Sequence, residues 1–592
     1  MFKKVISKEI FWLLLLFSFV LIIYCLFPMQ CRIQFGHGQD ANENSWWLER
    51  GLSFVRLKDV FYPLLSYWFY RIWKMFGWQK GGMYPLQVLS SIFGAGGIII
   101  FYFLVKTIFE DKKISLVSSI FLAFSYGYWF FSIESVNNIL CLFFILLAML
   151  LLFKISEEDF VKFPIYIALS HSIAVFIEVL GFLLAPAMAF GLYLFTKDKK
   201  KGYVRALIYL FTFVFVTLSV HWFIGYTYFG VHGLKDLIRT LTSSSPMEID
   251  ILYRRLWLTL LTLSHTLFAW SHVELVSANL YTISNIINTI FLHTLFLGIL
   301  FTIFNIKKFS QIYTKIILFS SFCIISTLPF YFYNEPTALE YYLYLLPFIY
   351  LFILVLFIDN RQKIRTPKLK NILNLSILAM LPIFINYNFF VGIYPRTKIE
   401  NNEAYREFLF LKRHVNSKDL LIILEGRGSP GLAICYLNKV AGKITDHIVY
   451  VECHEQILCS VYGTDAWESL VKEAKPDYPI HYEELNLRRG EDEYYYGQSF
   501  YKSLTDKYQR FDNIKIFITR ENIEKVLKDD NKIFNVSNII VEVAKLSSGY
   551  FRENKLTQKF LDTLDKNYSF ELVPNTSEKE LKGTLLSLSR RK

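Results

Sequence analysis

Two carboxylates in the first long polar segment are the residues best placed to do chemistry. Asp40 and Glu43 stand in the stretch GHGQDANENSWWLERG, a few residues after an apolar span, so they lie near a membrane surface. A general base must be ionised and within hydrogen-bond reach of the proton that it removes. Shielded by Trp46 and Trp47, Asp40 could meet a lipid-borne substrate there. A structural alternative stays open, because Asp40 and Glu43 also fit the capping box of a helix that begins near Ala41.

Two further acidic side chains stand at the ends of later apolar segments. Glu134 lies in FSYGYWFFSIESVNN with Asn137 close by, and ionisable groups at membrane depth usually face a cavity or a partner. The alternative for this segment is a polar hairpin tip. Glu178 follows His171 by about two helical turns, so one helix face would carry both. This spacing predicts a buried pair of His171 and Glu178, either functional or a structural polar contact between helices.

A cluster of cations predicts a binding site for phosphate or pyrophosphate on the same side of the membrane. The lysines and arginines between 230 and 255 are Lys235, Arg239, Arg254 and Arg255. A guanidinium matches phosphate oxygens with two parallel hydrogen bonds. Attraction to anionic lipids, or simple anchoring at the interface, is the alternative. Glu340 and Tyr341, in YNEPTALEYYLYLLP, are further candidates for substrate binding, although an aromatic belt is expected at this depth in any case.

Membrane spans are the elements that must position these residues. The 592-residue chain is 54% hydrophobic and 18% aromatic, too apolar for a soluble protein. Apolar runs near 20 residues cross a hydrocarbon core of about 30 Å, and the chain has about eleven of them. They are 10–28, 85–108, 114–132, 135–153, 163–177, 179–195, 206–229, 281–304, 312–331, 341–358 and 371–392. The first run is too long for a cleavable signal peptide and lacks a small-residue cleavage site.

One apolar segment, 253–272, is expected to lie on the membrane instead of crossing it. It carries Arg254, Arg255, His265 and His272, with tryptophans near both ends. A span here would also reverse the charge pattern of everything that follows. We therefore predict a helix in the outer interface, within an interfacial segment 230–280.

Basic residues predict the orientation of the spans. Lys and Arg gather before the first span and after the second, fourth, sixth, eighth and tenth, whereas the opposite loops SIESVNN and YNEPTALE carry none. We expect a multi-pass protein of the cell (inner) membrane with a cytoplasmic N-terminus. The outer loop 29–83 and the C-terminal domain would then be extracytoplasmic. The net charge of +13 reflects this topology, so no nucleic-acid partner is expected.

A second domain is expected after residue 392, where the composition becomes charged and polar. Residues 1–392 would form the membrane domain and 393–415 a connector that ends in a helix. In 416–592, the strands LLIILE, HIVYVE and IKIFIT alternate with helical patterns, which is typical of a soluble α/β domain with a parallel or mixed sheet.

Two motifs in the second domain can be explained without a functional role. GRGSPG follows a strand in the form of a dinucleotide fingerprint, but Ser429 as N-cap and Pro430 as first helical residue explain it better. Cys453 and Cys459 could pair, could bind a metal together with His454, or could be unrelated thiols.

Several segments together resemble the GT-C superfamily of polytopic membrane glycosyltransferases, especially its protein O-mannosyltransferase-like branch (glycosyltransferase family 39-like). They are the first outer loop with its Asp, the YPLL-aromatic segment that begins at Tyr62, FSYGYWFFSIESVN, LEYYLYLLP, and an outer α/β domain containing GRGSPGLAICYLNKVAGKITDHIVYVE. The resemblance implies an α-helical polytopic membrane protein of GT-C type with a C-terminal α/β soluble domain.

The resemblance also implies a reaction and its partners. The donor would be a sugar on a polyprenyl phosphate, and the acceptor a protein, a lipid or a glycan at the lipid bilayer. Asp40 would be the catalytic general base, with Glu43 in support, and Glu134 would line the cavity. No cofactor is certain and no metal ligand is assigned, although a divalent metal stays an open alternative.

Three departures from the family pattern limit this transfer. Ala41 stands where many relatives have a second acid, Val60 and Phe61 stand where a His often precedes the YPLL-type segment, and Glu178 stands near a position where relatives tend to have His. A transporter or an envelope-assembly protein with an outer binding domain is the rival class. Transporters usually show internal repeats, and this chain has none that we detect.

Overall fold

The computed structural model describes most of the membrane part and the strands of the C-terminal part. The described residues are 8–30, 59–154, 159–229, 252–269, 278–334, 337–426, 443–445, 447–453, 459–463, 513–519, 568–573 and 583–590, with single residues 45, 48, 233, 235, 237, 434, 437 and 566. The chain divides into two compact units, one of residues 1–30 and 47–398 and the other of residues 31–46 and 399–592.

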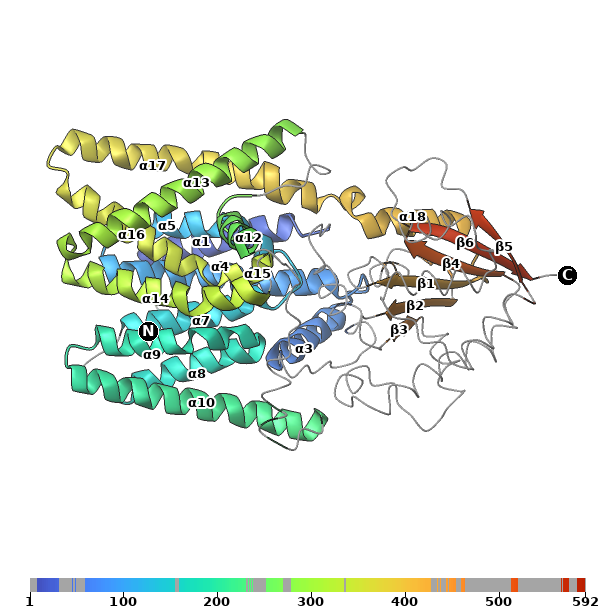
Figure 1. The fold of residues 1–592 in the computed structure, drawn as a ribbon, viewed down its shortest axis with the longest axis horizontal. Helices are drawn as coiled ribbons and strands as arrows, with labels where there is room; N and C mark the ends of the chain where they lie inside the picture. The colour runs from blue at the N-terminus through green and yellow to red at the C-terminus, as the bar shows by residue number, and fades with distance from the viewer. Residues whose placement is uncertain are drawn as a thin grey trace, which may run out of the picture. The chain divides into compact units, whose positions relative to one another are not determined.

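Long apolar helices make up the first unit, and every predicted span coincides with helical structure. The helices are α1 (Lys8–Leu26), α4 (Met83–Phe109), α5 (Lys112–Ala123), α6 (Tyr126–Ser132), α7 (Asn138–Phe153), α8 (Lys162–Ile177), the short 3-10 helix η1 (Val179–Leu184), α9 (Ala185–Phe195), α10 (Lys199–Phe229), α13 (Ala278–Asn305), α14 (Gln311–Asn334), α15 (Leu339–Leu343), α16 (Leu346–Lys363) and α17 (Pro367–Tyr387). Most of the long ones run side by side along the unit (Figure 1).

Length and composition identify the helices that can cross a membrane alone. In the described part of the chain these are α1, α4, α10, α13, α14 and α17, and the bent pair of α5 and α6 adds a seventh span if it is counted as one. Helices α7, α8 and the pair of η1 and α9 are shorter but equally apolar. The protein is therefore an α-helical, multi-pass membrane protein, as its hydropathy predicts.

The predicted span 114–132 is not one straight helix, because the chain bends by 66° between α5 and α6. The break is stabilised by a distant segment. The amides of Tyr126 and Gly127 donate to the carbonyls of Leu267 (3.2 Å) and Thr266 (2.9 Å). Since the first amides of a helix lack partners within it, these bonds allow α6 to begin again inside the bundle.

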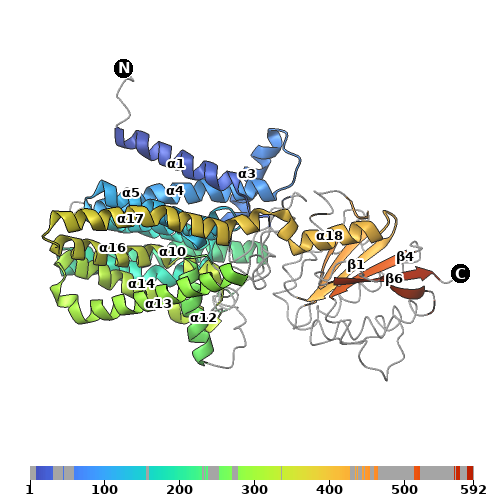
Figure 2. The same ribbon diagram turned by 90° about the horizontal axis from the view of Figure 1, so that it is seen from above.

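Two shorter helices complete the first unit, α3 (Phe61–Met75) and α12 (Leu252–His265). Helix α12 has 14 residues, about 21 Å at 1.5 Å per residue, which is too short to span. It runs across the direction of the long helices (Figure 2). Its length and direction agree with the predicted interfacial helix. Helix α3 buries Tyr62, Pro63, Ser66 and Tyr70 and exposes a face with Trp68 and Met75.

Close packing around α4 holds α1 and α6 against it. A Cβ added at Gly94 would collide with Ser132, and one at Gly97 would collide with Tyr128. The Tyr128 hydroxyl donates to the carbonyl of Gly94 at 2.7 Å, and the Tyr24 hydroxyl of α1 donates to the carbonyl of Ala123 at 2.7 Å. Small residues allow helices to approach closely in a membrane, where hydrophobic attraction between helices is weak.

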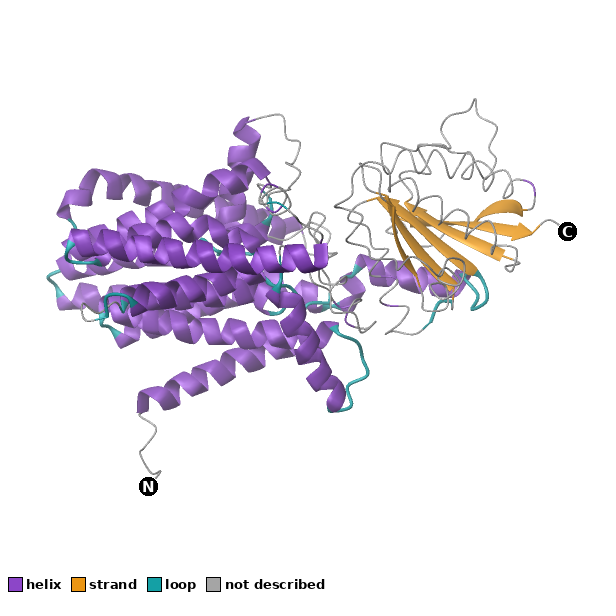
Figure 3. Ribbon diagram, turned by 90° about the horizontal axis from the view of Figure 1, so that it is seen from below, coloured by secondary structure: helices purple, strands orange, loops and turns teal. Residues whose placement is uncertain are grey.

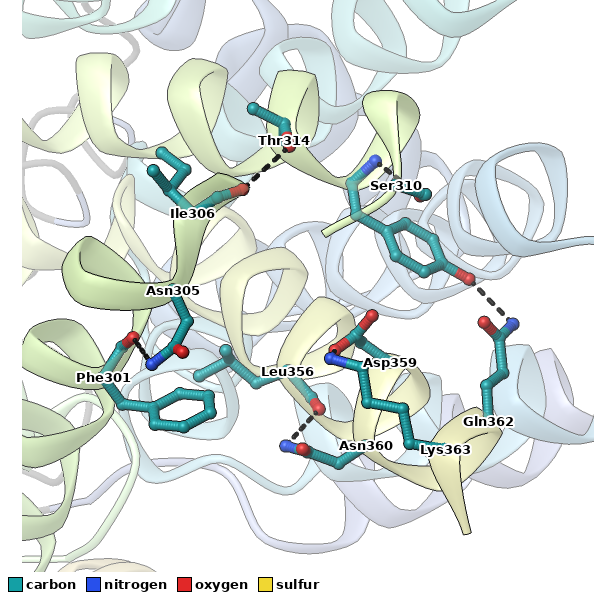
Figure 4. Close-up of polar contacts among 11 residues, drawn as sticks. Phe301, Asn305, Ile306, Ser310, Thr314, Leu356, Asp359, Asn360, Gln362 and Lys363 are labelled. Carbon is teal, nitrogen blue, oxygen red and sulfur yellow. Dashed lines mark hydrogen bonds and ion pairs between the residues drawn. The ribbon is translucent and has the colours of Figure 1, made fainter. Parts of the chain in front are cut away.

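One end of the bundle collects ion pairs and basic residues. Glu9 contacts Lys106 and Lys112, the latter at 2.8 Å, and Asp111 contacts Arg361 at 3.6 Å. The same end includes the turn between α13 and α14, where η2 (Ile306–Lys308) lies, and the last turn of α16 (Figure 4). There the Gln362 amide donates to the Tyr313 hydroxyl at 3.1 Å, and Lys363 pairs with Asp359.

The end of α17 is irregular. A π-helix, η3 (Asn388–Ile393), is followed by 3-10 turns η4 (Tyr394–Thr397) and η5 (Ile399–Asn401) and then by α18 (Glu403–His414). π-helical turns are rare and often occur at functional sites.

The described strands of the second unit form a mixed sheet (Figure 3). The sheet has six strands in the order β3-β2-β1-β4-β6-β5. The strands are β1 (Leu420–Gly426), β2 (His447–Cys453), β3 (Cys459–Gly463), β4 (Asn513–Thr519), β5 (Tyr568–Val573) and β6 (Gly583–Arg590). Strand β1 is parallel to β2 and β4, and the other pairs are antiparallel. The expected parallel or mixed sheet is confirmed, and the helices predicted between its strands lie outside the described ranges.

The two motifs of this unit stay predictions. The backbone register pairs Cys453 with Cys459 across β2 and β3, which is compatible with pairing of the thiols, and His454 lies outside the described residues. Gly426 ends β1, and the rest of GRGSPG also lies outside the described residues.

Candidate active site at one end of the helical bundle

The candidate site residues are only partly within the described structure. Asp40, Glu43 and Arg239 lie outside the described residues, and for Arg254 only the backbone within α12 is described. The structure describes the other six candidates: Glu134, Asn137, Lys235, Arg255, Glu340 and Tyr341. Most of these six residues lie at the end of the bundle opposite the ion pairs of Glu9 and Asp111.

The segment that leads into the Asp40 loop is held by three hydrogen bonds. The Met29 amide donates to the carbonyl of Ile133 at 3.2 Å, and the Gln30 amide donates to the carbonyl of Arg396 at 3.0 Å. The buried amide of Gln87 donates to the Met29 carbonyl at 2.6 Å. The loop with Asp40 therefore starts from a fixed point between α4, the 133–137 turn and η4.

Glu134 lies in the turn between α6 and α7 and is 3% exposed. Hydroxyl groups of α4 hold both sides of this turn. Ser91 donates to the Ser132 carbonyl at 2.8 Å, and Ser90 donates to the Val136 carbonyl at 3.3 Å. A carboxylate in so rigid and buried a turn is no solvated hairpin tip, which favours a role at a cavity.

Asn137 and Glu178 form a polar pair at the end of α8. The Asn137 amide donates to the carboxylate of Glu178 and to the Ile177 carbonyl, both at 2.9 Å. The other carboxylate oxygen of Glu178 accepts from the Leu180 amide at 3.4 Å and so caps η1. Both side chains are half-buried.

The predicted pair of His171 and Glu178 was wrong. His171 is fully buried and contacts the Tyr209 hydroxyl at 2.6 Å and the Gly181 carbonyl at 2.9 Å. Glu178 has extended backbone and lies beyond the last residue of α8, so the helical spacing between the two residues does not apply. His171 instead fixes η1 against α8 and α10.

A buried node with Arg396 and His265 was missed by the sequence analysis. Arg396 is fully buried, donates to the Gly392 carbonyl at 2.6 Å and lies over the ring of Tyr126 at 5.5 Å. Burial, and to a smaller extent the nearby Arg396 guanidinium, lowers the pKa of His265 to about 3. A single Arg just after the last span, at the end where basic residues are scarce, was the available signal.

Asn388 ties this node together from the start of η3. Its side-chain oxygen accepts from the Ala269 amide, and its amide donates to the carbonyls of Phe124 and Leu267, all at 2.8 Å. One fully buried side chain thus joins the break after α5, the chain beyond α12 and the π-helical turn.

The cations of the interfacial segment differ in their contacts and exposure. Arg255 donates to the Tyr333 carbonyl at 2.6 Å and lies over the Tyr333 ring, so α12 is fixed to the end of α14. Tyr341 stacks on Tyr331 of α14 at 5.5 Å. Lys235 is exposed, and Glu340 is half-buried in the first turn of α15. Arg255 and Tyr341 thus both contact residues in the last turn of α14.

Within the described residues, no group of three or more His, Cys, Asp and Glu side chains could hold a metal ion.

The sequence matches no protein-family model and no curated protein. Solved structures do match. ArnT from Cupriavidus metallidurans in the apo state aligns over 98% of both chains with a TM-score of 0.51 and 8% identity. The same protein bound to undecaprenyl phosphate aligns over 97% of this chain and 98% of the other, with a TM-score of 0.49 and 8% identity. An Archaeoglobus fulgidus oligosaccharyltransferase tethered with an acceptor peptide aligns over 99% of this chain and 74% of the other, with a TM-score of 0.42 and 11% identity.

The likeness to apo ArnT shows that the two chains share a fold over nearly their whole lengths. The GT-C fold expected from the sequence resemblance is thereby confirmed.

Proposed function

We propose that this protein is a membrane glycosyltransferase that moves a sugar from a polyprenyl-phosphate donor to an acceptor on the extracytoplasmic side. Because one fold serves many functions, the proposal rests on the site. The observation that carries it is the anchored entry to the Asp40 loop, where Met29 and Gln30 are bonded beside Glu134 and Arg396. This end of the bundle holds both a buried carboxylate, Glu134, and a buried guanidinium, Arg396.

The reaction follows from the charges at this end of the bundle. Asp40 removes the proton of the acceptor's hydroxyl or amide group as the acceptor attacks the anomeric carbon. The bond between that carbon and the phosphate oxygen breaks, and the polyprenyl phosphate leaves with an additional negative charge. Cations placed where this charge develops lower the barrier. Arg255 and Arg396 are the described candidates, with Lys235, Arg239 and Arg254 from the interfacial segment.

The sidedness in this proposal follows from the basic residues. Lys106, Lys112 and Arg361 lie at the end of the bundle opposite Glu134. By the positive-inside rule that end faces the cytoplasm, so the candidate site faces outward. A lipid-borne donor is chemically suited to such a place, since its phosphate stays at the membrane surface while its tail stays in the bilayer.

The proposal is tested with purified protein in liposomes that contain polyprenyl-phosphate donors with a radiolabelled sugar, offered as mannose, glucose, N-acetylglucosamine and a pentose. Acceptors are a Ser/Thr-rich peptide, a lipid A-like lipid and a polysaccharide. We expect label in one acceptor fraction together with an equal amount of free polyprenyl phosphate. Movement of intact donor across the bilayer, with no cleavage of any donor, would instead identify a transporter.

A further inference from the structure

His221 of α10 presents a buried hydrogen-bond acceptor. Its Nδ1 lies 2.8 Å from the Thr217 carbonyl, and because a carbonyl only accepts, Nδ1 must carry the hydrogen. In the neutral ring this leaves Nε2 with a lone pair and no hydrogen. The residue is fully buried, and no described residue donates to Nε2.

Asn137 presents a second acceptor. Both neighbours of its amide nitrogen, the Ile177 carbonyl and the Glu178 carboxylate, are acceptors, so the orientation of the side chain is fixed by chemistry. The amide oxygen then points away from them, and within the described residues nothing donates to it. Since Asn137 is half-buried, this oxygen can be reached by a ligand.

These groups gather around the end of α8. Asn137 bonds to Ile177 and Glu178, and the ring of His221 packs on Phe176 with centroids 5.4 Å apart. We name Asn137, Glu178 and His221 the acceptor cluster. It lies near α14, because η1, which Glu178 caps, packs against that helix. In the last turn of α14, Tyr331 stacks with Tyr341.

A cation lies at the last turn of α14. Arg255 bonds to the carbonyl of Tyr333, two residues beyond Tyr331. One end of the bundle thus holds the acceptor cluster at the end of α8 and the cation Arg255 at the end of α14. A phosphate group has acceptor oxygens and negative charge, so the acceptor cluster repels it and Arg255 attracts it. A ligand of the acceptor cluster must instead bring several donors, and the adjacent hydroxyls of a sugar ring supply them.

We propose that the acceptor cluster binds the hydroxyl groups of the sugar carried by the lipid donor, with the phosphate on the Arg255 side. This assignment rests on the proposed glycosyl transfer, and it divides the donor between two recognition sites. A buried acceptor without a donor is unfavourable, so the sugar gains more here than it would from hydrogen bonds at an open surface.

Binding of two probes by the protein in nanodiscs tests this assignment. One probe is the polyprenyl-phosphate sugar that wild type binds most tightly among the mannose, glucose, N-acetylglucosamine and pentose forms, and the other is polyprenyl phosphate without sugar. His221→Phe keeps an aromatic ring against Phe176 and removes the Nε2 acceptor. Asn137→Leu removes the second acceptor, the amide oxygen. The matched control is His293→Phe, because exposed His293 makes the same bond to a carbonyl one turn earlier, at 2.7 Å from Thr289.

We expect each variant of the cluster to bind the sugar-bearing lipid about tenfold more weakly, with unchanged affinity for the bare lipid phosphate. His293→Phe should bind both probes as wild type does. Wild-type affinity for the sugar-bearing lipid in both cluster variants would overturn the assignment. An equal loss for both probes would overturn it too, since the cluster would then act on the phosphate or on the fold.

The outcome of these binding measurements does not depend on whether the proposed sugar transfer is observed. Both measurements report binding, so they can be read even if no transfer occurs. If transfer is observed while sugar binding is unaffected in both variants, the function stands and the sugar subsite is wrong.

Discussion

Asn388 offers the sharpest test of how the node around Arg396 is held together. Its side chain makes three hydrogen bonds of 2.8 Å to Ala269, Phe124 and Leu267, which belong to segments more than 100 residues away in the sequence. Replacing Asn388 by Leu keeps the volume similar and removes all three bonds. The break between α5 and α6 and the chain beyond α12 then lose their shared partner.

The size of the effect follows from the groups left behind. The Ala269 amide becomes a buried donor with no partner, which costs about 1–3 kcal/mol. The Leu267 carbonyl keeps its bond from Tyr126 at 3.2 Å, so each of the other two lost bonds costs about 0.5–1.5 kcal/mol. We therefore expect Asn388→Leu to lower the free energy of unfolding by about 2–6 kcal/mol.

Equilibrium unfolding in mixed micelles, with sodium dodecyl sulfate as denaturant and tryptophan fluorescence as readout, measures this difference. Asn386→Leu is the matched control, because Asn386 is exposed near the end of α17, two residues before Asn388, and bonds locally, to the Pro382 carbonyl at 2.8 Å. The control should stay within about 0.5 kcal/mol of wild type. If Asn388→Leu has the same free energy of unfolding as the control, the three hydrogen bonds of Asn388 do not stabilise the fold and the reasoning is refuted.

Two other predictions concern the same end of the bundle. Gln87→Leu removes the bond to the Met29 carbonyl, so the Asp40 loop should start from a less fixed point and kcat should fall about tenfold or more, whereas exposed Gln79→Leu should leave it unchanged; equal rates in the two variants would refute the anchoring role. His265 has a pKa of about 3 when folded and about 6.5 when unfolded, so the unfolded chain binds more protons between these values. The free energy of unfolding should therefore decrease as pH falls from 6.5 toward 3, and His265→Gln should flatten this part of a stability-against-pH curve. An unchanged curve in the variant would assign the pH dependence to other groups.

Hydropathy was sufficient to locate the spans, because each apolar run must be helical inside a bilayer whatever surrounds it. It could not locate the break after Ala123, since the bonds that stabilise this break come from Thr266 and Leu267. The local sequence around Ala123 cannot predict hydrogen-bond partners that lie so far along the chain. The charge pattern, with Arg254 and Arg255, predicts that segment 253–272 lies in the interface, and the 14-residue length of α12 is compatible with this prediction.

The site was harder to predict than the fold for a similar reason. The spacing of His171 and Glu178 predicts one helix face only if the helix continues, and α8 ends at Ile177. Arg396 carries no motif, and its place beside His265 depends on the π-helical turn that Asn388 begins. Glu134 is buried and Asn137 is bonded to Glu178, but their predicted role in substrate binding stays a prediction.

The role of Asp40 is the central claim, and a single comparison tests it most directly. Asp40→Asn and the control Glu110→Gln, an exposed carboxylate at the opposite end of the bundle, are each assayed for donor binding and for sugar transfer. If Asp40 is the general base, Asp40→Asn binds the polyprenyl-phosphate sugar as wild type does and transfers it at least about a hundredfold more slowly. The control should do both at wild-type levels. Full transfer by Asp40→Asn would contradict the account.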